Sequence, residues 1–156
     1  MNKLAWKAMK TIKLGTGMKN ADDFLMSLEE SGAHVSDFAT KIMQSPNFTV
    51  VEHEAEIDIV FISVAKLGIT EKKVPREQVY AKAKELGLEL CPNEVGPQLR
   101  LQYNDQPEHE RLLIAMEGDE VFCLENNGCK PALKNWRARP DKWYKHYLCA
   151  FVLPRK

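Results

Sequence analysis

Residues Leu86–Glu117 read LGLELCPNEVGPQLRLQYNDQPEHERLLIAME, and this stretch decides the fold because it leads from a helix into a predicted hairpin. Apolar and polar residues alternate over Gln98–Tyr103, a period of two that predicts a strand. A turn rich in Asn, Asp and Pro follows, and Arg111–Glu117 is predicted to return antiparallel to the first strand. One face of that strand is then polar, and it carries Gln98, Arg100 and Gln102.

Two interpretations of this polar face remain open. An antiparallel sheet often has one solvated side, and Gln-Arg-Gln is typical of it. Alternatively, the Arg100 guanidinium binds a carboxylate or phosphate, while Glu94 or Glu117 acts as an acid or base. Because the sequence does not fix the distance between Glu94 and Glu117, a small hydrolase or transferase built on Glu94, Arg100 and Glu117 stays an alternative.

Caps, breakers and periodicity predict the other elements. Helices are expected between Asn20 and Gly32, between Ser36 and Pro46, and between Pro75 and Gly87. Strands are expected at residues 9–14, 48–51, 57–64, 121–125 and 147–153, with 57–64 central. Asn127-Gly128 predicts a two-residue hairpin loop that places Glu125 opposite Lys130. Together these features predict an α+β domain over residues 1–156: N-terminal helices plus a mainly antiparallel curved sheet of about five to seven strands, with a partly closed barrel as one form it can take.

Composition limits the class of protein. A chain of 156 residues is long enough for one domain with its own core, and no apolar run approaches the roughly 20 residues of a membrane-spanning helix. Lysines interrupt every apolar cluster near the N-terminus, so no signal peptide is predicted and a cytoplasmic location is expected.

The four cysteines form no C-x-x-C pair and are expected to be small buried residues. A zinc site using Cys123, Cys129 and one histidine is the alternative, although no spacing supports it. We therefore expect neither a metal nor a cofactor.

Charge is segregated along a chain whose net charge is +0. Residues 1–20 carry five lysines and no acid, and residues 128–156 carry eight Lys or Arg against Asp141 alone. Residues 21–127 hold the remaining nine basic and 21 acidic side chains. Basic ends can lie against the acidic body, or they can form a patch that meets phosphate.

The C-terminal segment NWRARPDKWYKHYLCAFVLPRK, residues 135–156, interleaves aromatic and basic side chains. Its candidate binding residues are Trp136, Arg137, Arg139, Lys142, Trp143 and Lys145. Stacking planes beside cations are typical of surfaces that bind single-stranded nucleic acid. A non-enzymatic binding protein for nucleic acid or another anionic partner is therefore the first hypothesis. A protein-interaction adaptor is a further alternative, and the same aromatic residues would equally suit packing on the sheet.

Four segments resemble a family of small uncharacterised bacterial proteins. These are KTIKLGTG at Lys10–Gly17, ADDF at Ala21–Phe24, and ELGLELCPNEVGPQLRLQYNDQP at Glu85–Pro107, which is followed by LLIAME at Leu112–Glu117. The resemblance covers roughly the first three quarters of the chain and departs from the family after Glu117. No activity, cofactor or site residue is established for that family, so the resemblance implies a common domain and no chemistry.

Overall fold

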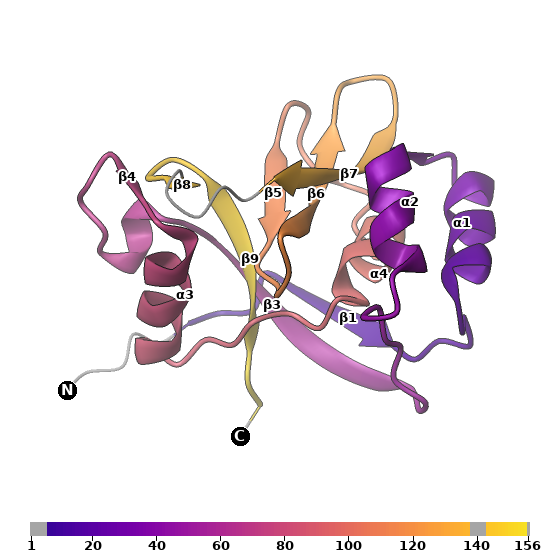
Figure 1. The fold of residues 1–156 in the computed structure, drawn as a ribbon, viewed down its shortest axis with the longest axis horizontal. Helices are drawn as coiled ribbons and strands as arrows, with labels where there is room; N and C mark the ends of the chain where they lie inside the picture. Colours follow the sequence, from indigo (N-terminus) through magenta and orange to yellow (C-terminus); the bar gives the residue numbers. More distant parts are fainter. Residues whose placement is uncertain (1–5, 138–142, 156) are drawn as a thin grey trace.

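The computed structural model describes residues 6–137 and 143–155, which form an α+β fold around a seven-stranded mixed sheet. The sheet has the order β1-β3-β9-β5-β6-β7-β2 and curls into a half-barrel (Figure 1). Its strands are β1 (Lys10–Leu14), β2 (His34–Val35), β3 (Ala55–Ser63), β5 (Arg111–Ile114), β6 (Glu120–Asn126), β7 (Pro131–Arg137) and β9 (Leu148–Leu153). The expected mainly antiparallel curved sheet is confirmed, with parallel pairing at β5–β9 and β2–β7.

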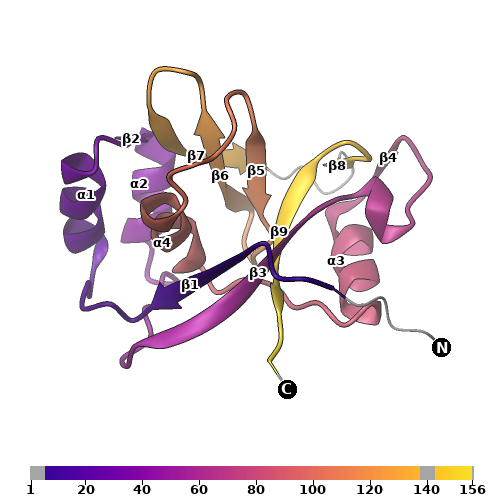
Figure 2. The same ribbon diagram turned by 180° about the vertical axis from the view of Figure 1, so that it is seen from behind.

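The helices divide between the two ends of the sheet (Figures 1 and 2). At one end lie α1 (Ala21–Glu30), α2 (Asp37–Gln44) and α4 (Val95–Gln102). At the other end α3 (Arg76–Glu85) lies beside a small ribbon of β4 (Lys73–Val74) and β8 (Trp143–Tyr144). A short 3-10 helix, η1 (Ala65–Leu67), precedes this ribbon. No helix in the described part of the chain combines the length and the apolar character needed to cross a bilayer.

The N-terminal helical pair confirms the predicted capping. The Asn20 side chain accepts a hydrogen bond from the Asp23 amide at 2.9 Å, and Ser36 accepts one from Ala39 at 3.1 Å. Each bond satisfies an amide that the first turn of a helix otherwise leaves unpaired. Phe24 is fully buried on the inner face of α1 and joins the common core.

The predicted strand at Gln98–Tyr103 is wrong, because Val95–Gln102 forms α4. Pro97 lies in the first helical turn, where its missing N–H would have had no partner. Gly96 lets the helix approach the sheet: a Cβ there would lie 2.2 Å from the Phe122 ring. Every residue from Val95 to Arg100 is buried, so the helix lacks the apolar stripe that would identify it in the sequence.

Three further predictions about strand pairing are corrected. Residues 48–51 form no strand and instead belong to the connection between α2 and β3. The strand at 57–64 exists as β3 but lies second from the edge of the sheet, between β1 and β9. Arg111–Glu117 shortens to β5, which pairs with β6 and β9, since the segment expected to pair with it is helical.

The β6–β7 hairpin is confirmed, but its predicted register is wrong. The ladder closes at Asn126–Pro131, so four residues form the loop, and Glu125 lies opposite Ala132 rather than Lys130. Pro131 and the preceding Asn-Gly turn account for the wider loop: the Asn127 side chain accepts hydrogen bonds from the amides of Cys129 and Lys130. Glu125 pairs instead with two basic side chains of neighbouring strands.

Candidate functional site

Three predicted site residues form a polar ladder along α4, defined here as Glu94, Gln98 and Gln102. Their spacing of four places them on one face of the helix. Gln102 donates to the Gln98 oxygen at 3.0 Å, and Gln98 donates to Glu94 at 2.9 Å. The ladder faces β1 and the turn after it: Gln102 bonds both backbone groups of Lys13, and Gln98 donates to the Thr16 hydroxyl.

Glu94 is a fully buried carboxylate that pins two loops. It accepts hydrogen bonds from the Gly15 amide at 2.8 Å and from the Val51 amide at 3.0 Å. Its neighbour Asn93 accepts from Thr49 and donates to the Asn47 carbonyl. These contacts hold residues 47–51 as an ordered connection without any strand partner.

Arg100 is buried, and its hydrogen-bond partners among the described residues are amide and carbonyl oxygens rather than carboxylates. It donates to the Gln106 side chain at 2.6 Å and to the Tyr103 carbonyl at 2.7 Å. Longer contacts reach the carbonyls of Glu125 and Ala132, so the guanidinium ties α4 to the β6–β7 hairpin. Burial lowers the pKa of Arg100 to about 10. Arg100 therefore acts as a structural link, and its donors face the protein interior.

The acid–base alternative required Glu94, Arg100 and Glu117 to converge, and the structure does not bring them together. Glu94 and Arg100 are six residues apart on a helix, which separates them by about 9 Å along its axis and places them on different faces. Glu117 is exposed on the turn between β5 and β6 and lines a surface groove that neither of the other two lines. This geometry gives no support to a hydrolase or transferase site.

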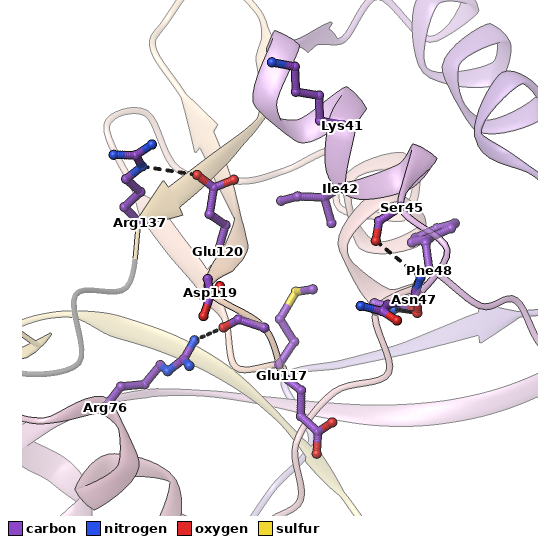
Figure 3. A pocket seen from close by; sticks show the side chains of 13 residues that line it. Lys41, Ile42, Ser45, Asn47, Phe48, Arg76, Glu117, Asp119, Glu120 and Arg137 are labelled. Atoms are coloured by element: carbon purple, nitrogen blue, oxygen red, sulfur yellow. Dashed lines mark hydrogen bonds and ion pairs between the residues drawn. The ribbon is translucent and has the colours of Figure 1, made fainter.

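The groove that Glu117 lines is the larger of two candidate binding sites. We call it the α2 groove; its volume is about 730 Å³, and it runs between α2 and the β5–β6 turn (Figure 3). Apolar lining comes from Ile42, Phe48 and Met116. The polar lining includes Lys41, Ser45, Asn47, Arg76, Asn93, Glu117, Asp119, Glu120 and Arg137.

The second candidate site is an aromatic patch, defined here as Trp136, Tyr144, His146 and Tyr147. The ring centroids of Trp136 and Tyr147 lie 5.6 Å apart, and those of His146 and Tyr147 lie 5.2 Å apart, both close to perpendicular. The Arg111 guanidinium lies 4.8 Å from the centre of the Trp136 ring. Trp136, His146, Tyr147 and Arg111 line a cavity of about 280 Å³.

Carboxylates offset much of the positive charge near this patch. The Glu125 carboxylate forms ion pairs with Arg111, at an N···O distance of 2.8 Å, and with Lys134, at 3.0 Å. Burial opposes ionisation of Glu125, but the hydrogen bonds from Lys134 and Arg111 outweigh it and lower the pKa of that carboxyl. Lys145 is exposed and forms no ion pair with a described residue.

The structure separates the predicted C-terminal surface into parts. Trp136 lines the aromatic cavity, whereas Arg137 lines the α2 groove and pairs with Glu120 at 3.3 Å. Successive strand residues point to opposite faces of a sheet, which accounts for this division. Trp143 is fully buried against Tyr80 and belongs to the core rather than to the predicted surface. The predicted binding residues Arg139 and Lys142 lie outside the described residues.

Among the described side chains, no group of three or more His, Cys, Asp or Glu is placed to hold a metal ion. Cys91, Cys123 and Cys149 are buried, as expected, but the same prediction is wrong for Cys129, which is exposed in the β6–β7 loop. Burial raises the pKa of Cys123 to about 12 and also raises the pKa of Cys91 and of Cys149. The three buried thiols are therefore protonated at neutral pH and unsuited to nucleophilic chemistry.

Sequence reasoning missed Arg76 and Arg111, one from each site. Neither has a signal beyond its charge, because Arg76 is simply the first residue of α3 and Arg111 the first of β5. The ladder did carry a signal, since Glu94, Gln98 and Gln102 recur every four residues. Gln98 and Gln102 are also separated by a multiple of two, so they fit the alternation of a strand equally well, and this accounts for the strand prediction.

No protein-family model matches this chain, and comparisons with curated proteins and with solved structures gave no significant match. Functional conclusions therefore depend on the geometry of the two sites.

Proposed function

We propose that this protein is a non-enzymatic binding protein for single-stranded nucleic acid and that the aromatic patch is its contact surface. The observation that carries the proposal is the Arg111 guanidinium over the Trp136 ring beside an open cavity lined by His146 and Tyr147. Unpaired bases stack on aromatic rings and on guanidinium planes, and such stacking depends little on base identity.

The proposal predicts weak dependence on salt. We assign the phosphate contacts to Arg111, which lines the cavity, and to Lys145, which is exposed next to His146 in the chain, because Arg137 faces the α2 groove. Two phosphate contacts on a single strand give a slope of about −1.4 in the logarithm of affinity against the logarithm of salt. Affinity should then fall about sevenfold between 50 and 200 mM salt. Stacking supplies the rest of the binding energy.

Fluorescence anisotropy with a labelled 12-nucleotide single strand, at those two salt concentrations, tests the proposal. We expect Trp136→Leu to weaken binding about tenfold, since one stacked base contributes roughly 1–3 kcal/mol. Lys145→Gln should weaken binding less and reduce the salt slope by about 0.7. Phe38→Leu and Lys19→Gln are matched controls, because both side chains are exposed and belong to the N-terminal helical region.

A duplex of the same sequence should bind less tightly than the single strand, because its bases are already stacked on one another. Absence of binding at the lower salt, or equal affinity of wild type and Trp136→Leu, would overturn the proposal. The proposed function also implies a cytoplasmic location. Its support is the set of three buried free thiols, which a reducing compartment would keep unpaired.

A further inference from the structure

We propose that the α2 groove is a second binding site, for a free α-amino acid with a large apolar side chain. This site is independent of the aromatic patch, since Arg137 and Trp136 point to opposite faces of β7. The groove has a charged end, an apolar floor and space for a side chain between them.

The charged end of the groove contains Arg76, whose guanidinium is only partly satisfied. Arg76 donates to the Gly118 carbonyl, and it forms no ion pair with any described residue. Its Nε atom is shielded from solvent and has no hydrogen-bond partner among the described residues. The Tyr80 ring lies 5.4 Å from the guanidinium carbon and packs against the Arg76 side chain. The shielded Nε cannot reach a ligand, but Nη2 makes no hydrogen bond to a described residue, so the outer end of the Arg76 guanidinium is left to bind a carboxylate.

A carboxylate lies beside this cation without pairing with it. Asp119 follows directly after Gly118, the residue that Arg76 binds, and it lines the same groove. Figure 3 shows Asp119 and Arg76 at one end, across the groove from Ile42 and Phe48. Asp119 is exposed and forms no ion pair with any described residue. The Arg76 cation complements a ligand carboxylate, and the Asp119 anion complements a ligand ammonium group. An α-amino acid carries both groups on adjacent atoms.

The remainder of the groove favours an apolar side chain. Ile42, Phe48 and Met116 line it, and Met116 is held because its amide and carbonyl both bond the Tyr80 hydroxyl. A volume of about 730 Å³ lies within the range of pockets that enclose small organic ligands. The Arg137–Glu120 ion pair neutralises two of the other charges, and the remaining lining charges, Lys41 and Glu117, are of opposite sign.

Isothermal titration with four probes tests the chemistry of the ligand. We expect L-phenylalanine to bind, whereas N-acetyl-L-phenylalanine lacks the ammonium and L-phenylalaninamide lacks the carboxylate, so each should bind at least tenfold more weakly. Glycine lacks the apolar side chain and should show no binding. Equal binding of N-acetyl-L-phenylalanine and L-phenylalanine would overturn the proposal, because Asp119 would then have no role.

Two variants tie the binding to the charged end. Arg76→Gln should weaken L-phenylalanine binding at least tenfold, and Asp119→Asn should do so without affecting the fold, because its carboxylate makes no contact with described residues that the fold requires. Lys84→Gln is the matched control, an exposed cation on the same helix. Far-ultraviolet circular dichroism verifies that each variant is folded. No detectable L-phenylalanine binding by wild type, or unchanged binding by folded Asp119→Asn, would refute the site.

Discussion

Replacing Glu94 with Gln is the sharpest test of how this fold is held together. The carboxylate is fully buried and accepts three hydrogen bonds, from Gly15, Val51 and Gln98, and no ion pair with a described residue compensates its charge. An amide has one acceptor oxygen. Its less costly orientation keeps that oxygen toward Gly15 and Gln98, which share Oε2, and turns the NH₂ group toward the Val51 amide.

The cost of Glu94→Gln follows from these contacts. The Val51 amide loses its acceptor in a part-buried hydrogen bond, which costs at most about 1–3 kcal/mol, and the two surviving bonds lose their charge assistance. We expect the free energy of unfolding to fall by about 2–4 kcal/mol. This is a large part of the typical total of roughly 5–15 kcal/mol, yet it should leave the protein folded.

Urea denaturation measures this loss, and amide hydrogen exchange locates it. Exchange at Val51 should accelerate more than exchange in the β6–β7 ladder, because opening becomes local. Glu52→Gln is the matched control: it makes the same chemical change on an exposed side chain in the same connection, and it should alter stability by less than about 0.5 kcal/mol. If Glu94→Gln were as mild as this control, the proposed role of Glu94 in holding the two loops would be refuted.

Three other expectations can be measured directly. Gly96→Ala should destabilise the protein by about 1–3 kcal/mol, since the new methyl group would collide with the Phe122 ring, and Phe122→Leu in the same chain should recover part of the loss in thermal unfolding. Hydrogen bonds from Arg155 and Thr11 lower the pKa of Asp58 below its ordinary value of 3.8. This carboxylate therefore stabilises the fold at neutral pH, and that contribution is lost as the pH falls below 3.8. Asp58→Asn should lower the free energy of unfolding at pH 7 and reduce its further loss on acidification. One thiol per folded chain should react rapidly with a disulfide reagent, because Cys129 alone of the four cysteines is exposed, and Cys129→Ser should abolish that fast phase.

Local signals correctly predicted the two N-terminal helices and the last strand. Asn20 and Ser36 act as helix caps through bonds to amides three residues further on, and such contacts are legible in a sequence. β9 also appears where the apolar run at 147–153 predicted it, because a strand covered by the core needs no alternation. These elements depend on neighbours in the chain.

The site residues depended on distant contacts and were harder to predict. The partner of Gly96 is Phe122, and the partner of Gln102 is Lys13, 89 residues away. In the sequence, Gly96-Pro97 followed by alternating polar and apolar residues favours a strand. Only the close approach of Gly96 to Phe122 shows why a helix forms there instead. Arg100 was predicted to bind a ligand, but it is buried in a cage of oxygen atoms that forms only once the β6–β7 hairpin lies against α4.

The two hydrogen bonds between the Gln102 side chain and the backbone of Lys13 also determine how the sheet ends. β1 is the outermost strand on its side, and a strand in that position exposes unpaired amides and carbonyls that can recruit another chain. The Gln102 amide donates to one Lys13 group and accepts from the other, as the backbone of an eighth strand would do. The Gln102 side chain thus occupies the backbone groups of Lys13, so a strand from another chain cannot pair with β1 at that residue.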